Sequence, residues 1–314
     1  MITVLTGGTG GAKFVAGLAS VVPVRELTVI VNTGDDLTWW GLHVSPDLDS
    51  ITYALAGMLS RERGWGVEGD SFRCLEAMRQ MGAPAWFQLG DRDLATHLRR
   101  TELLSANRCL SAATSEIARS LGVQARILPM SDDHVETRVM TADGELSFQE
   151  YFVRERYQVA VRGVRFDGAE QARPAPTVLE AIAQAEAVIL APSNPITSIG
   201  PILAVPGIRQ ALARTRAPVA AISPIVAGAA VSGPAGELMS TQDLPVSIAG
   251  VARCYADFLN LLIAEEQDSA FGPFVERIAV RYTRTVMRSE VERAALARSV
   301  LGFLEERPRE AAVS

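Results

Sequence analysis

The chain has 314 residues, of which 48% are apolar and 21% charged, with a formal net charge of −6. This composition is typical of a folded protein with a sizeable core. It excludes the basic surface of a nucleic-acid-binding protein and the roughly 18-residue apolar spans of a membrane protein. An odd number of distant cysteines, together with an N-terminus that leads directly into a strand, predicts a cytoplasmic protein without disulfides.

The first fourteen residues predict a strand, a tight turn and a helix. An apolar β-branched run at residues 2–5 is followed by a glycine loop of Gly7, Gly8, Thr9, Gly10 and Gly11, and then by Lys13. Glycines let a backbone approach a ligand, and the free N–H groups of a helix start attract an anion. The spacing departs from the Walker and dinucleotide patterns. The loop therefore either binds a phosphate, with Lys13 adding charge, or only connects the strand to the helix.

A predicted helix at residues 14–22 and a second apolar strand at residues 27–31 complete a strand–helix–strand unit. Its right-handed crossover makes the two strands parallel, and ligands of such sheets lie beyond the carboxyl ends of the strands. We therefore expect Asp35 and Asp36, which follow the second strand, to lie close to the glycine loop.

Four carboxylates fall within residues 35–49. A helix start at Pro46 places Asp47 and Asp49 in the first helical turn. Carboxylates beside phosphates repel them unless a hard divalent cation lies between, so the pattern predicts a Mg²⁺ site. Its candidate ligands are Asp35, Asp36, Asp47 and Asp49. The alternative is that these residues are helix caps and turn residues.

Residues 49–121 are expected to form a mainly helical insertion over the sheet edge. We expect Arg99 and Arg100 to be solvated helix charges, and His97 to be a surface histidine rather than an acid or base. The chain has four tryptophans, which we expect to pack in a core or a subunit interface rather than stack on a flat ligand.

The second half predicts further strands and two more polar loops. Strands are expected at residues 124–128, 136–140, 146–148, 160–166, 187–191 and 219–222, with helices at 177–185 and 208–214. Loops at residues 192–201 and 223–234 each follow an apolar strand, as the glycine loop does. Three such loops predict a nucleotide-sized crevice in an α/β protein with a mostly parallel sheet.

The tail from residue 251 is expected to be two helices, with residues 307–314 frayed. We predict a nucleotide-binding core at residues 1–265, which carries the insertion at about 49–121 and a small antiparallel β portion. A C-terminal helical extension at residues 266–314 is expected to pack on this core.

Seven stretches in chain order resemble the 2-phospho-L-lactate transferase family of coenzyme F420 biosynthesis, whose actinobacterial members make the dehydro form. They are LTGGTGGAKF (5–14), VNTGDD (31–36), SPDLDS (45–50), RGWGV (63–67), LGDRDLATH (89–97), APSNPITSIGPIL (191–203) and ISPIVAG (222–228). Each stretch alone is weak, but together they are specific.

The resemblance implies a Rossmann-like fold, a homodimer and a Mg²⁺-assisted reaction. A phosphorylated three-carbon acid would move from a guanosine diphosphate-linked donor to the ribityl hydroxyl of the deazaflavin Fo, and GMP would leave. The glycine loop with Lys13 would hold the phosphates, and Asp49, with Asp47, would face the Fo hydroxyl or the metal. Arg92 would contact Fo. The guanosine side would be lined by Ser193, Asn194 and Ser198.

One position departs from the family pattern, because Ser232 stands before Gly233 where a lysine or arginine is expected. Donor preference among phospholactate, phosphoenolpyruvate and phosphoglycerate therefore stays open. Attack by a hydroxyl on phosphorus needs positioning and charge neutralisation rather than a protein nucleophile. We expect Asp49→Ala to abolish turnover and leave the fold intact.

Two other functions fit parts of the pattern. An NAD(P)-dependent oxidoreductase would use Asp35 or Asp36 to hold a ribose, because an acid some twenty residues after a glycine loop is the dinucleotide arrangement. A nucleotide-binding regulatory protein would share the glycine loop and the loop at residues 192–201. The retained SPDLDS and GDRD stretches favour the transferase.

Overall fold

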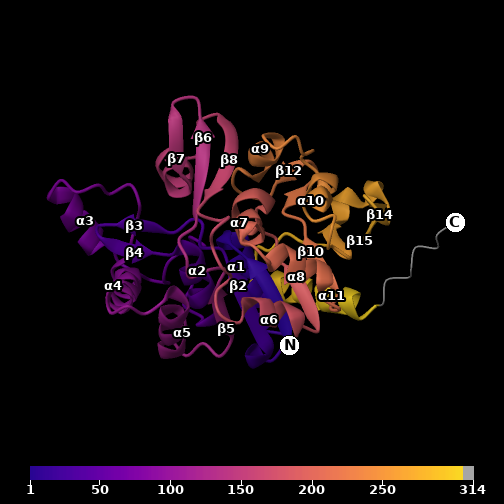
Figure 1. Cartoon of the computed structure of the whole chain (residues 1–314), viewed down its shortest axis with the longest axis horizontal. Helices are drawn as coiled ribbons and strands as arrows, with labels where there is room; N and C mark the ends of the chain where they lie inside the picture. Colours follow the sequence, from indigo (N-terminus) through magenta and orange to yellow (C-terminus); the bar gives the residue numbers. More distant parts are fainter. Residues whose placement is uncertain (307–314) are drawn as a thin grey trace.

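The computed structural model describes residues 1–306, and its centre is an eight-stranded sheet (Figure 1). The strand order is β14-β15-β13-β10-β9-β1-β2-β5, and every neighbouring pair is parallel except β14 with β15. The bounds are β1 (Ile2–Thr6), β2 (Leu27–Val31), β5 (Arg126–Pro129), β9 (Ala187–Leu190), β10 (Val219–Ile222), β13 (Leu261–Glu265), β14 (Phe274–Val275) and β15 (Ile278–Thr283).

Apolar residues fill both faces of this sheet. Every residue of β2, β9 and β10 is buried, as the continuous apolar runs predict for strands covered on both sides. Along β1, Val4 belongs to one core cluster and Leu5 to the other, because successive side chains point to opposite faces. The predicted α/β fold with a mostly parallel sheet is confirmed.

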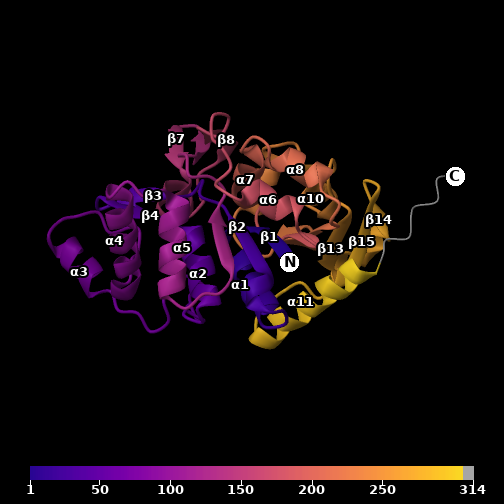
Figure 2. The same ribbon diagram turned by 60° about the horizontal axis from the view of Figure 1, so that its bottom comes forward.

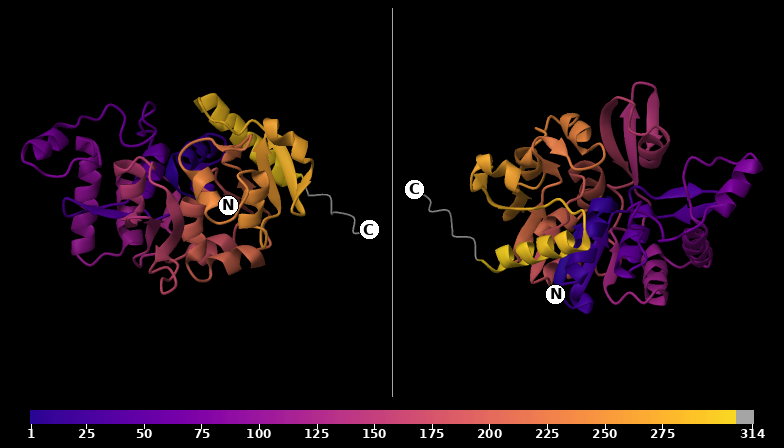
Figure 3. Two further views of the ribbon diagram at one scale, coloured as in Figure 1. Left: turned by 90° about the horizontal axis from the view of Figure 1, so that it is seen from above. Right: turned by 180° about the vertical axis from the view of Figure 1, so that it is seen from behind.

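Helices cover the two faces of the sheet in two layers (Figure 2). One layer contains α1 (Gly8–Ala19), α2 (Pro46–Leu55), α5 (Leu110–Ser120) and α11 (Glu290–Glu305). The other contains α6 (Val178–Ala183), α7 (Gly200–Ala204), α8 (Ile208–Arg214) and α10 (Ile248–Cys254). The C-terminal helix α11, in yellow, lies across α1, in indigo, in the right-hand view of Figure 3. The first and last helices of the described chain therefore share one core.

Smaller elements extend from the sheet and surround the carboxyl ends of its strands. The antiparallel sheet β7-β6-β8 projects above the main sheet in Figure 1. Its strands are β6 (Glu136–Thr141), β7 (Gly144–Ser147) and β8 (Val161–Asp167). Two small hairpins also lie at the periphery, β3 (Leu37–Trp39) with β4 (Leu42–Val44) and β11 (Ile225–Val226) with β12 (Ala229–Ala230). The peripheral helices are α3 (Arg73–Gln80), α4 (Asp91–Ser105) and α9 (Ala235–Ser240). The small antiparallel portion is confirmed, whereas the domain boundaries stay predictions.

One local expectation is wrong, and one hairpin was not predicted. The tail from residue 251 is not two helices, because β13, β14 and β15 lie between α10 and α11. The five buried residues of β13 are too short an apolar run for periodicity to separate strand from helix. The hairpin β3–β4 has no counterpart among the predicted strands. Its turn uses Trp40 and Gly41, both at positive φ (52° and 77°), and tryptophan is not a usual residue for such a turn.

Within residues 1–306, no single helix is both long and apolar enough to cross a membrane, although the pair Pro195–Ala204 and Ile208–Arg214, bent by 90°, passes on combined length and composition. The frayed end expected at residues 307–314 lies outside the described residues.

Candidate active site

A cavity of about 740 Å³ opens at the carboxyl ends of the central strands. The strand order reverses between β1 and β9, so the loops that follow these two strands diverge and leave a crevice where α/β proteins bind ligands. The predicted residues that line the cavity are Gly7, Gly8, Thr9, Gly10, Lys13, Asp35, Asp47, Asp49, Ser193, Asn194 and Ser198. Three predicted residues, Gly11, Asp36 and Arg92, lie outside its lining.

The glycine loop forms the junction between β1 and α1. No side chain of the N-cap residue caps α1, but the N–H of Gly8 donates to Asp47 Oδ1 at 2.7 Å. A Cβ on Gly7 would lie 2.6 Å from Asp47 Oδ2, and one on Gly10 would lie 2.6 Å from the carbonyl oxygen of Pro192. Only glycine permits this close approach. The loop therefore brings the start of a twelve-residue helix, which favours an anion, directly against a carboxylate.

Asp35 and Asp47 form a buried pair of carboxylates held by one amide. Asn32 Nδ2 donates to Asp35 Oδ2 at 3.0 Å and to Asp47 Oδ2 at 3.1 Å. Asp35 Oδ1 is buried and has no hydrogen-bond partner among the described residues. No lysine, arginine or histidine of residues 1–306 forms an ion pair with either carboxylate. The pair thus carries negative charge that the described chain does not compensate.

The pKa values of this pair reflect the missing counter-charge. Burial raises the pKa of Asp35 well above its ordinary value, and the charge of Asp47 adds to the effect. Burial also raises the pKa of Asp47 to about 6, although the hydrogen bond from Gly8 opposes the shift. A bound cation would supply this counter-charge and lower the pKa of both carboxyl groups.

Asp36 lies outside the cavity lining. Ser45 Oγ donates to its Oδ1 at 2.6 Å, and His43 Nε2 lies 3.0 Å from its Oδ2. The side chain therefore joins β4 and the start of α2, and its oxygens are already engaged.

Asp49 lies in a second buried group, which α2 and α4 build together. Arg100 binds both carboxylate oxygens of Asp49, with Nη1 at 3.1 Å from Oδ2 and Nη2 on Oδ1. Burial is the largest single influence and opposes the charge of Arg100, but the charge and hydrogen bonds of Asp49 together with the charge of Asp36 outweigh it, so the pKa of Arg100 is raised. The pair is a fork-shaped, charge-assisted contact.

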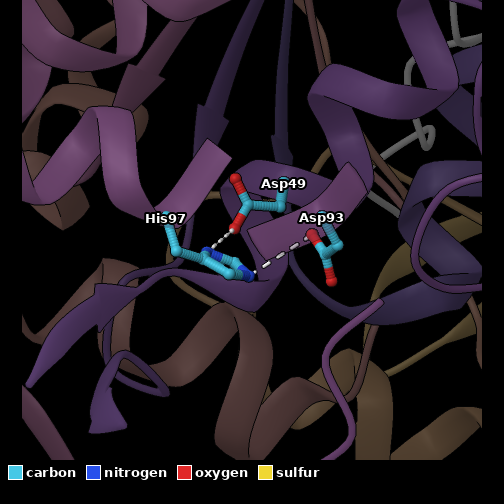
Figure 4. Close-up of side chains that lie close together, drawn as sticks. All are labelled: Asp49, Asp93 and His97. Carbon is cyan, nitrogen blue, oxygen red and sulfur yellow. Dashed lines mark ion pairs between the residues drawn. The ribbon is translucent and has the colours of Figure 1, made fainter. Parts of the chain in front are cut away.

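His97 lies between Asp49 and Asp93 (Figure 4). Its Nδ1 is 3.5 Å from Asp49 Oδ2, and its Nε2 is 3.3 Å from Asp93 Oδ1. Although close to Asp93, the buried Nε2 has no hydrogen bond of acceptable geometry among the described residues. Tyr53 completes the group by donating its OH to Asp93 Oδ1 at 2.8 Å.

The expectations for His97 and Arg100 as surface residues are wrong, since they are 1% and 2% exposed. Arg99 is exposed, as expected, and pairs with Glu102 and Glu116. Asp93, which the sequence reasoning did not single out, joins the buried group. The available clue was spacing, because positions 93, 97 and 100 fall on one helix face.

Arg92, expected to contact Fo, is exposed at the start of α4. Its Nη1 donates to the carbonyl oxygen of Glu68 at 3.1 Å, and its N–H donates to Asp70 Oδ1.

Asp49, Asp93 and His97 each offer a ligand atom, and these atoms lie within 4.8 Å of one another. The group could therefore hold a metal ion. Arg100 already occupies both oxygens of Asp49, however, and its charge opposes a cation at the same carboxylate. Asp35 and Asp47 carry no such charge, so they fit a hard divalent cation better.

Aromatic rings form the outer wall of the cavity. Trp65 and Trp86 line it together with Phe148 and Phe152. Trp39 instead packs edge-on against Trp86, with ring centroids 4.7 Å apart, and is 7% exposed. Core packing therefore holds for Trp39, whereas Trp65 and Trp86 line the cavity, with the guanidinium groups of Arg63 and Arg154 5.4 and 5.8 Å from their respective ring centroids.

A glycine loop at a switch point, beside buried acids and an aromatic wall, defines an α/β enzyme that acts on phosphate-bearing ligands. Residues 2–273 match the family model described as 2-phospho-L-lactate transferase CofD. The chain belongs to this family.

Relatives match over nearly the whole chain. It is 43% identical over 304 residues to the 2-phospho-L-lactate transferase of Methanosarcina acetivorans, covering 96% of this chain and 98% of that protein. It is 44% identical over 313 residues to the phosphoenolpyruvate transferase of Streptomyces griseus, covering 97% and 98%. A crystal structure of a UPF0052-family protein from Bacillus halodurans has a TM-score of 0.63 at 18% identity, covering 96% and 98%, and shares the fold.

The predicted family and activity are therefore confirmed. The chain is an enzyme, a CofD-type transferase of lactyl or enolpyruvyl phosphate to Fo in coenzyme F420 biosynthesis.

Proposed function

We propose that the donor is a guanosine diphosphate-linked phospho-acid and that the acceptor is the ribityl 5′-hydroxyl of Fo, with GMP as the leaving group and F420-0 or its dehydro form as the product. The observation that carries this proposal is the contact between Gly8 and Asp47 at 2.7 Å. It joins an anion-binding helix start and a pair of uncompensated acids in one cavity of about 740 Å³, a volume typical of ligand pockets.

The phosphates of the donor would lie over the glycine loop. The N–H groups at the start of α1 and the charge of Lys13 favour the diphosphate. Lys13 is the only lysine of the chain. The loop after β9 would contact the guanosine side through Ser193, Asn194 and Ser198, which line the same cavity. Ser193 Oγ donates to the carbonyl oxygen of Gly7 at 2.8 Å, so the two loops would act as one binding surface.

We assign Mg²⁺ to Asp35 and Asp47, with Asp36 and Asp49 as the less suited members of the predicted ligand set. The unpartnered Asp35 Oδ1 and the raised pKa values of both acids support this choice. When bound, the ion would supply positive charge to phosphate oxygens that the acids would otherwise repel.

Asp49 would orient the acceptor hydroxyl or take its proton. Arg100 fixes the Asp49 carboxylate in one orientation, and a carboxylate held in place is suited to positioning a nucleophile. Asp47 would then hold the Mg²⁺ that neutralises the phosphates of the donor, and it would not contact Fo. The proposed contact of Arg92 with Fo would require its guanidinium to leave the Glu68 carbonyl oxygen.

The residues of this chain would thus supply position and charge. The backbone N–H groups of the glycine loop are suited to stabilise the charge that develops on the departing phosphate oxygens. Asp49 would orient the Fo hydroxyl or take its proton, and no covalent intermediate with the protein is needed.

The test is incubation of the enzyme with Fo, Mg²⁺ and one guanosine diphosphate-linked donor at a time, carrying phospholactate, phosphoenolpyruvate or phosphoglycerate. Mass spectrometry should detect GMP together with Fo enlarged by one phospho-acid for at least one donor. Absence of product with all three donors would contradict the proposal. The expected homodimer and the cytoplasmic location stay proposals, and light scattering of the purified chain tests the first.

A further inference from the structure

Arg156 is a cavity residue to which the family match assigns no role. It lines the cavity directly after the short π-helical segment η2 (Glu150–Arg154). Arg156 and Tyr157 both have positive φ, 52° and 46°, a conformation that costs free energy in residues other than glycine. Two such residues in succession indicate that the surrounding structure holds this turn in place.

Stacked aromatic rings supply that support. Tyr157 stacks on Phe152 with centroids 5.6 Å apart, and Phe152 stacks on Phe148 at 5.5 Å. The N–H of Tyr157 also donates to the carbonyl oxygen of Tyr151 at 2.8 Å. Phe148 and Phe152 line the cavity themselves, so Arg156 stands at the end of an apolar shelf.

The charge of Arg156 has no partner among residues 1–306, because no ion pair or side-chain hydrogen bond involves it. The nearby acids are used by Arg154, which pairs with Glu150 and Glu155. A second arginine of the lining, Arg288, donates its backbone N–H to Glu292 Oε2 at 2.7 Å, and this hydrogen bond and the Arg288 charge lower the pKa of Glu292. Its guanidinium, like that of Arg156, forms no ion pair among residues 1–306. Arg156 is therefore an exposed residue of the cavity lining whose guanidinium has no counter-charge among residues 1–306.

This inference rests on the proposed function and specifies one contact of the donor. The glycine loop and Lys13 account for the diphosphate, which leaves the carboxylate of the three-carbon acid as the remaining anionic group of the donor. A guanidinium binds a carboxylate through two parallel hydrogen bonds, and the shelf of Phe148 and Phe152 suits the short carbon chain. We propose that Arg156 binds the carboxylate of the transferred acid and makes the enzyme selective for acid-bearing donors.

The experiment compares two donors on two enzymes. One donor is the guanosine diphosphate ester of L-lactate, and the other is the isopropyl ester, in which a methyl group replaces the carboxylate. The variant is Arg156→Gln. The control is Arg162→Gln, because Arg162 is exposed on β8, outside the cavity lining. Thermal unfolding of each protein verifies that it is folded.

Arg156→Gln should raise the KM for the lactate ester by about 10- to 100-fold, the usual effect of losing a charge-assisted hydrogen bond. The isopropyl ester should show the same KM with wild type and variant, and the KM for Fo should stay unchanged. Arg156→Lys should recover part of the loss, and Arg162→Gln should change neither donor.

Three results would overturn the assignment. Equal losses for both esters would place Arg156 on the nucleotide or in the fold, a rise in KM for Fo would place it on the acceptor, and no change would remove it from binding. If wild type forms product from neither ester, the comparison is repeated with the phosphoenolpyruvate and phosphoglycerate donors. The proposed function fails as well only if wild type forms product from none of these donors, a result that the wild-type measurement alone reveals.

Discussion

Asp47 and Asp49 are two residues apart in the first turn of α2 and are 7% and 4% exposed, yet among residues 1–306 only Asp49 has an arginine as its counter-charge. Positions i and i+2 of a helix face different directions. Asp49 therefore faces α4 and meets Arg100, whereas Asp47 faces the glycine loop and meets only neutral donors from Gly8 and Asn32.

The difference separates a carboxylate that the fold neutralises from one that it leaves for a ligand. Asp49 has its counter-charge within the described chain, without any ligand, so its position can be fixed before substrate arrives. Asp47, with Asp35, gains a counter-charge only when a cation binds. Two substitutions and one change of pH and Mg²⁺ test this difference between Asp49 and Asp47.

The largest effect is expected from removing Arg100. Arg100→Met should lower the free energy of unfolding by about 3–5 kcal/mol, because it leaves a buried acid without its partner. Urea denaturation measures the change. Arg99→Met is the matched control on the same helix, since its exposed side chain should contribute little. Similar losses for both variants would show that the buried pair has no special weight.

The same argument changes the sequence-based expectation for Asp49→Ala. That variant was expected to lose turnover with an intact fold, but it would leave Arg100 buried without its counter-charge. Its loss of activity alone would therefore not separate a catalytic role from a structural one. Asp49→Asn, which keeps the shape and part of the hydrogen bonding, is the better variant for turnover measurements.

The next effect is expected from Asp47→Asn, which should separate activity from stability. Turnover should fall by about 10²- to 10³-fold, because a charge that holds the cation and the phosphates is lost. The free energy of unfolding near neutral pH should stay equal or rise, since the variant removes an uncompensated buried charge. Steady-state rates with Fo and the donor, together with urea denaturation, measure both quantities.

Asp36→Asn is the control for that variant, because Asp36 lies outside the cavity lining and its oxygens bind Ser45 and His43. It should retain most of the turnover. An equal loss for Asp36→Asn would return Asp36 to the metal ligands and contradict the choice of Asp35 and Asp47.

Local sequence rules predicted the phosphate side of the site, with the glycine loop and its acids, but not the buried Asp49–Arg100 pair. The glycine loop, Asp35 and Asp47 could be brought together from sequence because a strand–helix–strand unit has one hand and ligands bind at one end of its sheet. The Asp49–Arg100 pair joins residues 51 positions apart. No local rule states which face of α4 turns toward α2, so Arg100 was assigned to the solvent.

The wall of the cavity was equally hard to predict. Arg156 lies in a turn whose two positive φ values are stabilised by stacking with Phe152, and neither residue type favours that conformation. The departure at Ser232 was visible in the sequence, and the structure places Ser232 in the cavity lining. The sequence alone could not indicate that another cation, Arg156, lines the same cavity.

The smallest effect tests the cation itself through pH. Burial raises the pKa of Asp47 to about 6, above the ordinary value of about 3.9. Between these values the folded protein keeps a proton that the unfolded chain has lost, so this carboxyl group lowers the free energy of unfolding as pH rises through about 4 to 6. Above about pH 6 the loss is complete, and the ionised group is ready for a cation.

Mg²⁺ should therefore stabilise the protein only where Asp47 is ionised. At saturating Mg²⁺ we expect the thermal midpoint to rise by a few degrees at about pH 7.5, a gain of about 1–2 kcal/mol, and to change little at about pH 5. Chelation with EDTA should reverse the gain, and Asp47→Asn should abolish it. The group of Asp49, Asp93 and His97 provides the opposing expectation. If the rise in thermal midpoint with Mg²⁺ persists in Asp47→Asn but disappears in Asp93→Asn, the ion binds to the group of Asp49, Asp93 and His97, beside Arg100, and not to Asp35 and Asp47.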